Sequence, residues 1–181
     1  PEKSMRYVTP YDGGYVCLTE NGEQVYAACN ERVLLLDALN GKLLKSLPVD
    51  VGKRRWGYLA QGKELLVLSR MKPSAPRIAT DRKTQRTFVD QDYRSERPLV
   101  CSREILVTGT DFGNKWQRES LGLIPHGGIS VDFEKGRVVL VEARSQRCLE
   151  HSTDRIPLAW LMEDAFLVCL DLDNEIGRAH V

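Results

Sequence analysis

Apolar residues recur along the chain in short runs, and the runs come in groups with the same internal order. Each group holds two runs joined by a short polar turn, followed later by a third run. Runs of about five to seven residues rich in Val, Ile, Leu and Tyr, bounded by Gly, Asn and Asp, are typical of β-strands. The pattern therefore predicts an all-β protein built from a repeated unit. The runs lie at 14–19, 24–29 and 32–37; at 57–60, 64–68 and 104–108; and at 128–131, 137–141 and 165–170.

The turn between the first two runs of a group indicates how the strands are joined. In the first group it is Glu20-Asn21-Gly22-Glu23, and Asn-Gly suits a tight hairpin because both residues tolerate positive φ. These strands are therefore expected to be antiparallel neighbours. A fourth run follows at 43–47 in the first group and at 115–119 in the second. Each unit is predicted to be a four-stranded meander, which is the blade of a β-propeller.

The number of units predicts a partial propeller. We expect blades at about 14–48, 56–120 and 127–174, within a propeller region that covers residues 1–174. The third group stops at Asn174, before its fourth run, so about two and a half blades are present. A closed propeller usually has four to eight blades, and the chain is therefore predicted to be a fragment of one.

The two ends of the chain also suggest a fragment. Ile176–Val181 reads like the translation of a sequencing-library adapter, and we expect residues 175–181 to be a non-native tail. An ordinary polar tail is the alternative. The chain begins at Pro1 without an initiator Met or a signal segment, so targeting information is expected to be missing from it.

Two long segments interrupt the repeat, at about 71–100 and 145–164. Both lie between the second and third strands of their blades. In a meander this connection opens on the same face as the link to the next blade, whereas the other two turns open on the opposite face. Loops carried by a rigid scaffold are where binding residues tend to lie. We therefore expect the functional face to be the one that bears both insertions.

Four residues near the links between blades are the candidate ligand-binding residues: Arg54, Trp56, Arg70 and His126. Arginine suits bidentate capture of a carboxylate or phosphate, and Trp56 could stack on a ligand. The alternatives are an ion pair for Arg70 and blade-to-blade packing for Trp56. His126 has no His or Cys partner at metal-ligand spacing, so a hydrogen-bonded structural histidine is the alternative to a base or metal ligand. No catalytic residue and no metal site is predicted, since neither a Gly-x-Ser-x-Gly elbow nor a phosphate-binding Gly loop is present.

Composition and charge further limit the functional classes to which the protein can belong. The chain is 42% hydrophobic and 28% charged, which is ordinary for a globular protein, and its net charge of +1 gives no general reason to expect nucleic-acid binding. No window of about 18 apolar residues exists, so no transmembrane segment is predicted. The five cysteines form no C-x-x-C pair, and those inside apolar runs are expected to act as small buried hydrophobes rather than in a disulfide or metal site.

The segment Leu34-Leu35-Leu36-Asp37-Ala38-Leu39-Asn40-Gly41-Lys42 resembles the signature of the PQQ-like repeat, with Asn40 in place of Thr. Residues 56–60, 69–73, 100–102 and 124–144 are similar to bacterial PQQ-binding-like β-propeller proteins. In that repeat the outer strand often carries a Trp that docks between blades. The first unit has Lys45 there and the second has Trp116.

This resemblance implies a location in the periplasm or at the cell surface. Many relatives bind no quinone, including the assembly lipoprotein of the outer-membrane β-barrel machinery. Quinone-dependent dehydrogenases of this fold resemble one another in a pair of adjacent cysteines and a calcium site, and this chain has no adjacent cysteines. We therefore expect a non-catalytic binding or scaffold module that engages an unknown small molecule or protein partner, with no cofactor evident.

Two other functions stay open at this point. The first is a quinone-dependent alcohol or sugar dehydrogenase, whose PQQ, calcium and catalytic residues would lie in missing blades. The second is an envelope protein-assembly scaffold.

Overall fold

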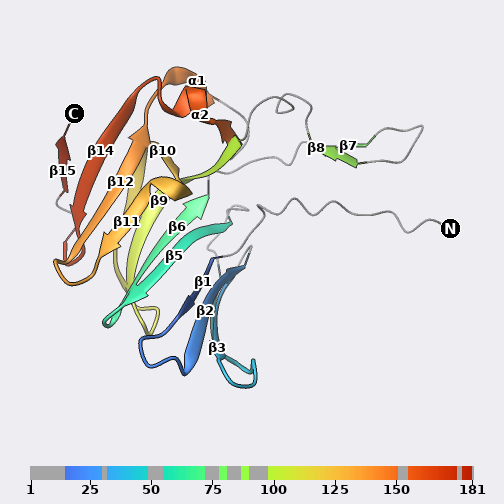
Figure 1. The fold of residues 1–181 in the computed structure, drawn as a ribbon, viewed down its shortest axis with the longest axis vertical. Helices are drawn as coiled ribbons and strands as arrows, with labels where there is room; N and C mark the ends of the chain where they lie inside the picture. The colour runs from blue at the N-terminus through green and yellow to red at the C-terminus, as the bar shows by residue number, and fades with distance from the viewer. Residues whose placement is uncertain are drawn as a thin grey trace.

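The computed structural model describes residues 15–29, 32–48, 55–71, 78–80, 87–89, 98–150, 155–174 and 177–180. Most of them lie in antiparallel strands, which form three groups arranged in a row (Figure 1). Each of these groups contains the strands of one predicted repeat unit. We number the groups as blades 1 to 3 in chain order.

Blade 1 is the meander that the sequence predicts. It holds β1 (Val16–Leu18), β2 (Gln24–Cys29), β3 (Arg32–Asp37) and β4 (Leu43–Pro48), in the spatial order β1-β2-β3-β4. The β1–β2 turn places Gly22 at a φ of 70°, a conformation that glycine adopts without a steric cost. In the β3–β4 turn the Asp37 carboxylate accepts hydrogen bonds from the backbone N–H groups of Leu39 and Asn40, at 2.9 and 3.0 Å.

Blade 2 has the same order but longer outer strands. It holds β5 (Trp56–Gly62), β6 (Leu65–Met71), β9 (Pro98–Gly109) and β10 (Asn114–Pro125). The last two are 12 residues each, whereas the sequence pattern predicted strands only at 104–108 and 115–119. The first insertion contains a separate hairpin of β7 (Ile78–Thr80) and β8 (Thr87–Val89).

Blade 3 follows the 3₁₀ turn η2 (His126–Gly128) and holds β11 (Ile129–Asp132), β12 (Arg137–Ala143), β14 (Ala165–Asp171) and β15 (Gly177–His180). The expectation that this blade lacks a fourth strand is wrong, because β15 pairs with β14 from Leu170↔Gly177 to Leu167↔His180. The residues of β15 show no apolar alternation in the sequence. They form a strand in the structure because they pair with the edge of β14. The non-native origin of residues 175–181 stays a prediction.

Blades 2 and 3 share one continuous sheet. After Glu119 the register of β10 on β9 shifts, and Leu123 of β10 then pairs with Ala143 of β12. The resulting order is β15-β14-β12-β10-β9-β6-β5, with β11 beside β12. The last part of β10 is therefore the physical link between the two blades.

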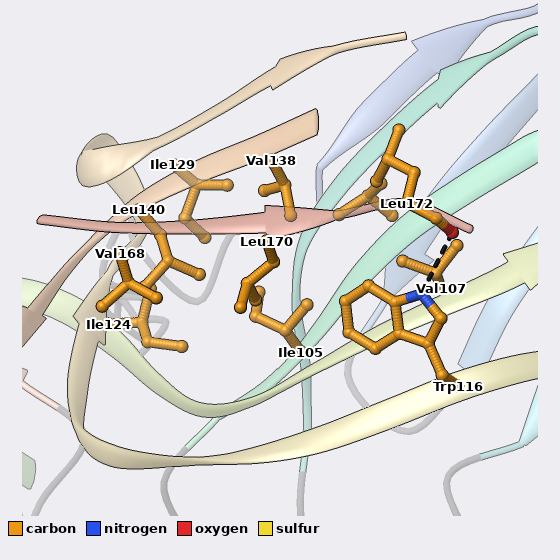
Figure 2. Packing of buried hydrophobic residues seen from close by; sticks show 11 residues of the cluster. Ile105, Val107, Trp116, Ile124, Ile129, Val138, Leu140, Val168, Leu170 and Leu172 are labelled. Atoms are coloured by element: carbon orange, nitrogen blue, oxygen red, sulfur yellow. Dashed lines mark hydrogen bonds between the residues drawn. The ribbon is translucent and has the colours of Figure 1, made fainter. Parts of the chain in front are cut away.

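The cores lie between the blades rather than within them. One cluster fills the space between blades 1 and 2, and a second fills the space between blades 2 and 3 (Figure 2). The first cluster contains Tyr26, Ala28, Val33, Leu35, Trp56, Leu59, Leu66, Leu68 and Leu106. The second contains Val67, Ile105, Val107, Trp116, Ile124, Ile129, Val138, Leu140, Val168, Leu170 and Leu172.

Corresponding residues of the outer strands dock each blade on the next. Leu35 pairs with Lys45 in blade 1, as Val107 pairs with Trp116 in blade 2. The ammonium group of Lys45 donates to the carbonyl of Asp111, and the indole N–H of Trp116 donates to the carbonyl of Leu172 at 3.0 Å (Figure 2). Both acceptors lie in the turn after the third strand of the following blade. Lys45 therefore makes the contact in blade 1 that Trp116 makes in blade 2.

The turns between first and second strands meet on one face of the molecule. The backbone N–H of Lys63 donates to the Glu20 carboxylate at 2.8 Å, and the Lys63 ammonium lies 3.5 Å from the Glu134 carboxylate. These three residues come from the corresponding turns of blades 1, 2 and 3. Stacked four-stranded meanders with their equivalent turns on one face define a partial β-propeller.

Candidate binding face

The second insertion folds onto the opposite face of the blades. It contains α1 (Gln146–Glu150), β13 (Arg155–Pro157) and α2 (Leu158–Leu161). β13 pairs with the beginning of β9, with Ile156 opposite Leu99, so the second insertion is joined to the strand that follows the first one. Figure 1 shows the two helices beside the ends of β10, β12 and β14. The end of the first insertion, residues 98–100, lies beside the second insertion, as the repeat predicted, and the face on which the hairpin β7–β8 lies stays a prediction.

A third apolar cluster supports this surface. It contains Cys101, Leu123, Ala143, Cys148, Ile156 and Leu161. Two further hydrogen bonds hold the insertion at its ends. The backbone N–H of Arg144 donates to the backbone carbonyl of Asp164 at 2.7 Å, and the Ser145 hydroxyl donates to the backbone carbonyl of Trp160 at 3.1 Å. We call the surface formed by residues 98–102, 143–150 and 155–164 the insertion face.

The outer side of the insertion face mixes apolar and charged groups. Leu158 is 54% exposed and Met162 is 65% exposed. Beside them the Arg147 guanidinium lies 4.4 Å from the centre of the Trp160 ring and 2.7 Å from the Glu163 carboxylate. An aromatic ring, an arginine and exposed apolar side chains are the residue types enriched in protein–protein interfaces.

His126 is a buried residue with defined partners. Its Nε2 lies 2.7 Å from the Ser102 hydroxyl, which in turn lies 2.7 Å from the Ser69 hydroxyl. The ring is 7% exposed, and burial lowers its pKa from 6.5 to about 4. The imidazole is therefore neutral near pH 7, and the edge of Tyr15 packs on it with ring centres 5.4 Å apart.

Trp56 and Arg70 are cross-strand partners at the beginning of β5 and the end of β6. The Arg70 guanidinium lies 5.2 Å from the centre of the Trp56 ring and 3.2 Å from the Glu104 carboxylate. Trp56 is 2% exposed and belongs to the cluster between blades 1 and 2. Arg70 is thus in an ion pair and Trp56 packs between blades, which are the structural roles named as alternatives above. A ligand-binding role for them stays a prediction.

The described candidates converge around Gly57, which follows Trp56. A Cβ atom on Gly57 would lie 2.5 Å from the His126 ring and 2.8 Å from the Ser102 hydroxyl, so only glycine leaves room for the histidine. Arg54 lies outside the described residues. The structure therefore brings Trp56, Arg70 and His126 to one end of β5, as their positions in the repeat suggested.

Sequence reasoning missed Glu142, the most deeply buried carboxylate among the described residues. It accepts hydrogen bonds from the Ser120 hydroxyl and the Leu121 N–H, the latter at 3.0 Å, and its other oxygen accepts from the Arg144 guanidinium. Burial would raise the pKa of Glu142, but the hydrogen bonds from Ser120 and Arg144 and the charges of Arg144 and Arg118 hold it below its usual value. The available signal was an acidic residue inside the apolar run 138–143.

The described residues hold no group of three or more His, Cys, Asp or Glu side chains that could bind a metal ion. None of the five cysteines, all of which lie among the described residues, forms a disulfide, and Cys101 and Cys148 are buried. No helix among the described residues is long and apolar enough to cross a membrane.

Comparisons with known proteins support the fold. No protein-family model and no curated protein sequence matches the chain. The WD40 domain of Pan2 from Neurospora crassa matches with a TM-score of 0.52 at 14% identity, over 90% of this chain and 37% of that domain. KlHsv2 with loop 6CD replaced by a Gly-Ser linker gives a TM-score of 0.33 at 10% identity, over 93% of this chain and 52% of the other. Dihydro-heme d1 dehydrogenase NirN in complex with DHE gives a TM-score of 0.30 at 10% identity, over 91% of this chain and 36% of the other.

The match to the Pan2 domain agrees with the strand order and register in assigning a β-propeller fold. The chain spans 37% of the length of that domain, which fits a propeller that is only partly present. At 14% identity the likeness concerns the fold alone.

Proposed function

We propose that this chain is a non-catalytic binding module that engages a protein partner through the insertion face. The observation that carries the proposal is the pairing of β13 with β9, which fixes the second insertion on its own apolar cluster. A fixed loop loses little conformational entropy when a partner binds. Leu158 and Met162 remain exposed on this fixed surface beside Arg147 and Trp160.

The burial of the Ser102–His126 pair supports a non-catalytic role. A serine hydroxyl 2.7 Å from an imidazole nitrogen is the geometry of a nucleophile and its base. Ser102 is, however, 0% exposed, and its hydroxyl also contacts that of Ser69. A substrate carbonyl has no access to this oxygen, so the pair is suited to holding the end of β5 in place.

Site-specific photo-crosslinking tests the proposal. A photo-reactive residue replaces Met162 on the insertion face in one variant and Leu39 in a matched control. Leu39 is 95% exposed but lies in the β3–β4 turn, on the opposite face. In cells of the natural source we expect a discrete protein adduct from position 162 that the substitution Leu158→Asp abolishes. Equal adducts from both positions would contradict the proposal.

The dehydrogenase alternative makes a different prediction. It requires the natural protein to bind PQQ with calcium and to reduce an artificial electron acceptor. We expect no quinone binding in a fluorescence titration. Quinone-dependent reduction of the acceptor would replace the binding-module proposal. The envelope location implied by the PQQ-like resemblance is part of the same proposal, and cell fractionation tests it.

A further inference from the structure

The insertion face carries an exposed apolar patch at α2. Leu158 begins this helix, and Met162 directly follows it with its backbone N–H bonded to the carbonyl of Leu158. A spacing of four residues places the two side chains on one side of the helix, and Ala159 beside them is also exposed. Figure 1 shows α1 and α2 at one end of the strands, whereas a further blade would stack on the outer side of blade 1 or blade 3. Adding blades to the row therefore does not by itself cover the patch.

The described arginine side chains of the insertion face are engaged within the protein. The Arg144 guanidinium donates through its Nε to the buried Glu142 carboxylate at 2.8 Å. The Arg147 guanidinium donates to the Glu163 carboxylate at 2.7 Å and packs over the Trp160 ring. Both positive charges are therefore matched by carboxylates of the same chain.

Two exposed carboxylates of the insertion face have no such counterion. Glu150 accepts a hydrogen bond from the neutral amide of Gln146 at 2.7 Å. Among the described residues no Lys or Arg side chain forms an ion pair with Glu150 or Asp164. Residues 145–164 hold four acidic and two basic residues, a net charge of −2, although the whole chain has a net charge of +1. The charge that this face offers to a partner is therefore negative.

We propose that the partner docks through an amphipathic segment whose apolar side chains are flanked by Lys or Arg. The apolar side chains cover Leu158 and Met162, and the basic ones lie against Glu150 and Asp164. This inference rests on the binding role proposed above for the insertion face, and it adds the chemistry of the partner.

Charge complementarity gives this face a means of selecting its partner. Opposite charges across an interface speed the encounter and fix the register, whereas like charges disfavour a wrong partner. The apolar patch alone would accept any apolar segment. The unmatched carboxylates therefore discriminate against acidic segments and against phosphate-rich partners such as nucleic acids.

Binding of two labelled probe peptides to the purified natural protein tests the proposal. Both are helical peptides of about 14 residues, or about four turns, with the same leucine stripe; one carries Lys and the other Glu at the remaining positions. Fluorescence anisotropy should show binding of the Lys peptide and at least about tenfold weaker binding of the Glu peptide. Raising the salt concentration should weaken only the Lys peptide, since its ion pairs are exposed.

Charge removal on the two faces supplies the matched variants. The double substitution Glu150→Gln and Asp164→Asn should weaken the Lys peptide about fivefold, because two exposed ion pairs are lost. Glu23→Gln with Glu134→Gln removes the same number of charges from exposed turns on the opposite face and should leave the binding unchanged. Equal binding of the two peptides, no binding of either, or equal losses in the two double variants would overturn the proposal.

The crosslinking at position 162 separates this inference from the binding role itself. In cells of the natural source, the Glu150→Gln and Asp164→Asn pair should lower the yield of the adduct about fivefold. An adduct whose yield is the same in this variant would disprove the basic partner and leave the binding role in place. A chain that forms no adduct at position 162 would disprove both.

Discussion

His126 owes its properties to three neighbours that are distant in the sequence. Ser102 binds its Nε2, Tyr15 packs against its ring, and Gly57 leaves the space that the ring occupies. Burial among these neighbours lowers the pKa of the imidazole to about 4. The residue is held neutral inside the fold.

This environment gives the stability a defined pH dependence. In the unfolded chain the imidazole has a pKa near 6.5 and is protonated below that pH. In the folded protein it stays neutral until the pH falls to about 4. Stability is therefore complete above pH 6.5 and falls as the pH drops toward 4, by up to about 3 kcal/mol. Urea unfolding at a series of pH values measures this fall, and His126→Asn should flatten it between pH 6.5 and 4.5.

Glu142 does not contribute to the same pH window. The pKa of Glu142 is lowered, so its contribution to stability is lost only below the ordinary range of a glutamate. Equal slopes for the unmodified protein and His126→Asn above pH 4.5 would show that His126 is protonated in the folded state.

At the level of elements, β13 shows how an insertion becomes part of the scaffold. Three residues of β13 pair with the beginning of β9, and Ile156 at its centre is 0% exposed between α2 and the ends of the blades. This pairing explains the unexpected length of β9. Its first residues have a partner outside their own blade, which the strand pattern of one repeat unit does not contain.

Removing the Ile156 side chain should release the insertion locally. Ile156→Ala leaves a cavity and should cost about 2 to 5 kcal/mol in the free energy of unfolding of the surrounding cluster. Hydrogen exchange should accelerate at Leu99 and Cys101, which adjoin β13, and remain unchanged at Ala28 and Val33 in blade 1. Leu158→Ala is the matched control on α2, since Leu158 is 54% exposed. Faster exchange in blade 1 as well would show that the insertion and the propeller unfold together.

The strands were largely predictable from the sequence, and their extensions were not. Alternating apolar residues bounded by turns located β2, β3, β6, β12 and β14 to within about three residues. The first residues of β9, 98–100, pair with the insertion strand β13, and Cys101, Ser102 and Arg103 then interrupt the apolar pattern before the predicted strand begins. Glu142 illustrates the same limit, since only the folded chain brings Ser120 and Arg144 to its oxygens.

At the scale of the whole molecule, stability depends on contacts between blades. Trp116 of blade 2 is 7% exposed, and its indole N–H donates to the Leu172 carbonyl of blade 3 at 3.0 Å. The repeat pattern pointed to a docking Trp at this position. It did not show that Lys45, a residue of different chemistry, fulfils the same role in blade 1.

The Trp116 hydrogen bond can be removed without removing an aromatic ring. Trp116→Phe leaves the Leu172 carbonyl unpaired and should lower the free energy of unfolding by about 1 to 3 kcal/mol. Trp160→Phe is the control, because Trp160 is half-buried on the insertion face. Urea unfolding monitored by circular dichroism measures both. Equal losses in the two variants would mean that ring size rather than the inter-blade bond determines the effect.

The candidate site was predicted in location more than in detail. The position of Trp56, Arg70 and His126 at the links between blades followed from the repeat, and they do lie at one end of β5. Packing of Trp56 between blades was the alternative that the sequence left open, and the blade 1 residues that cover it are brought there only by stacking.

The path of β10 has a consequence for how such a protein can change over evolutionary time. Because Leu123 pairs with Ala143, the border between repeats 2 and 3 runs through the middle of a strand. A gene rearrangement with its break inside β10 would separate β12 of repeat 3 from its partner. It would also leave one repeat with only part of the β10 strand. Duplication or loss of a single repeat is therefore expected to succeed only where the break lies outside β10, so these two repeats should be inherited as a pair.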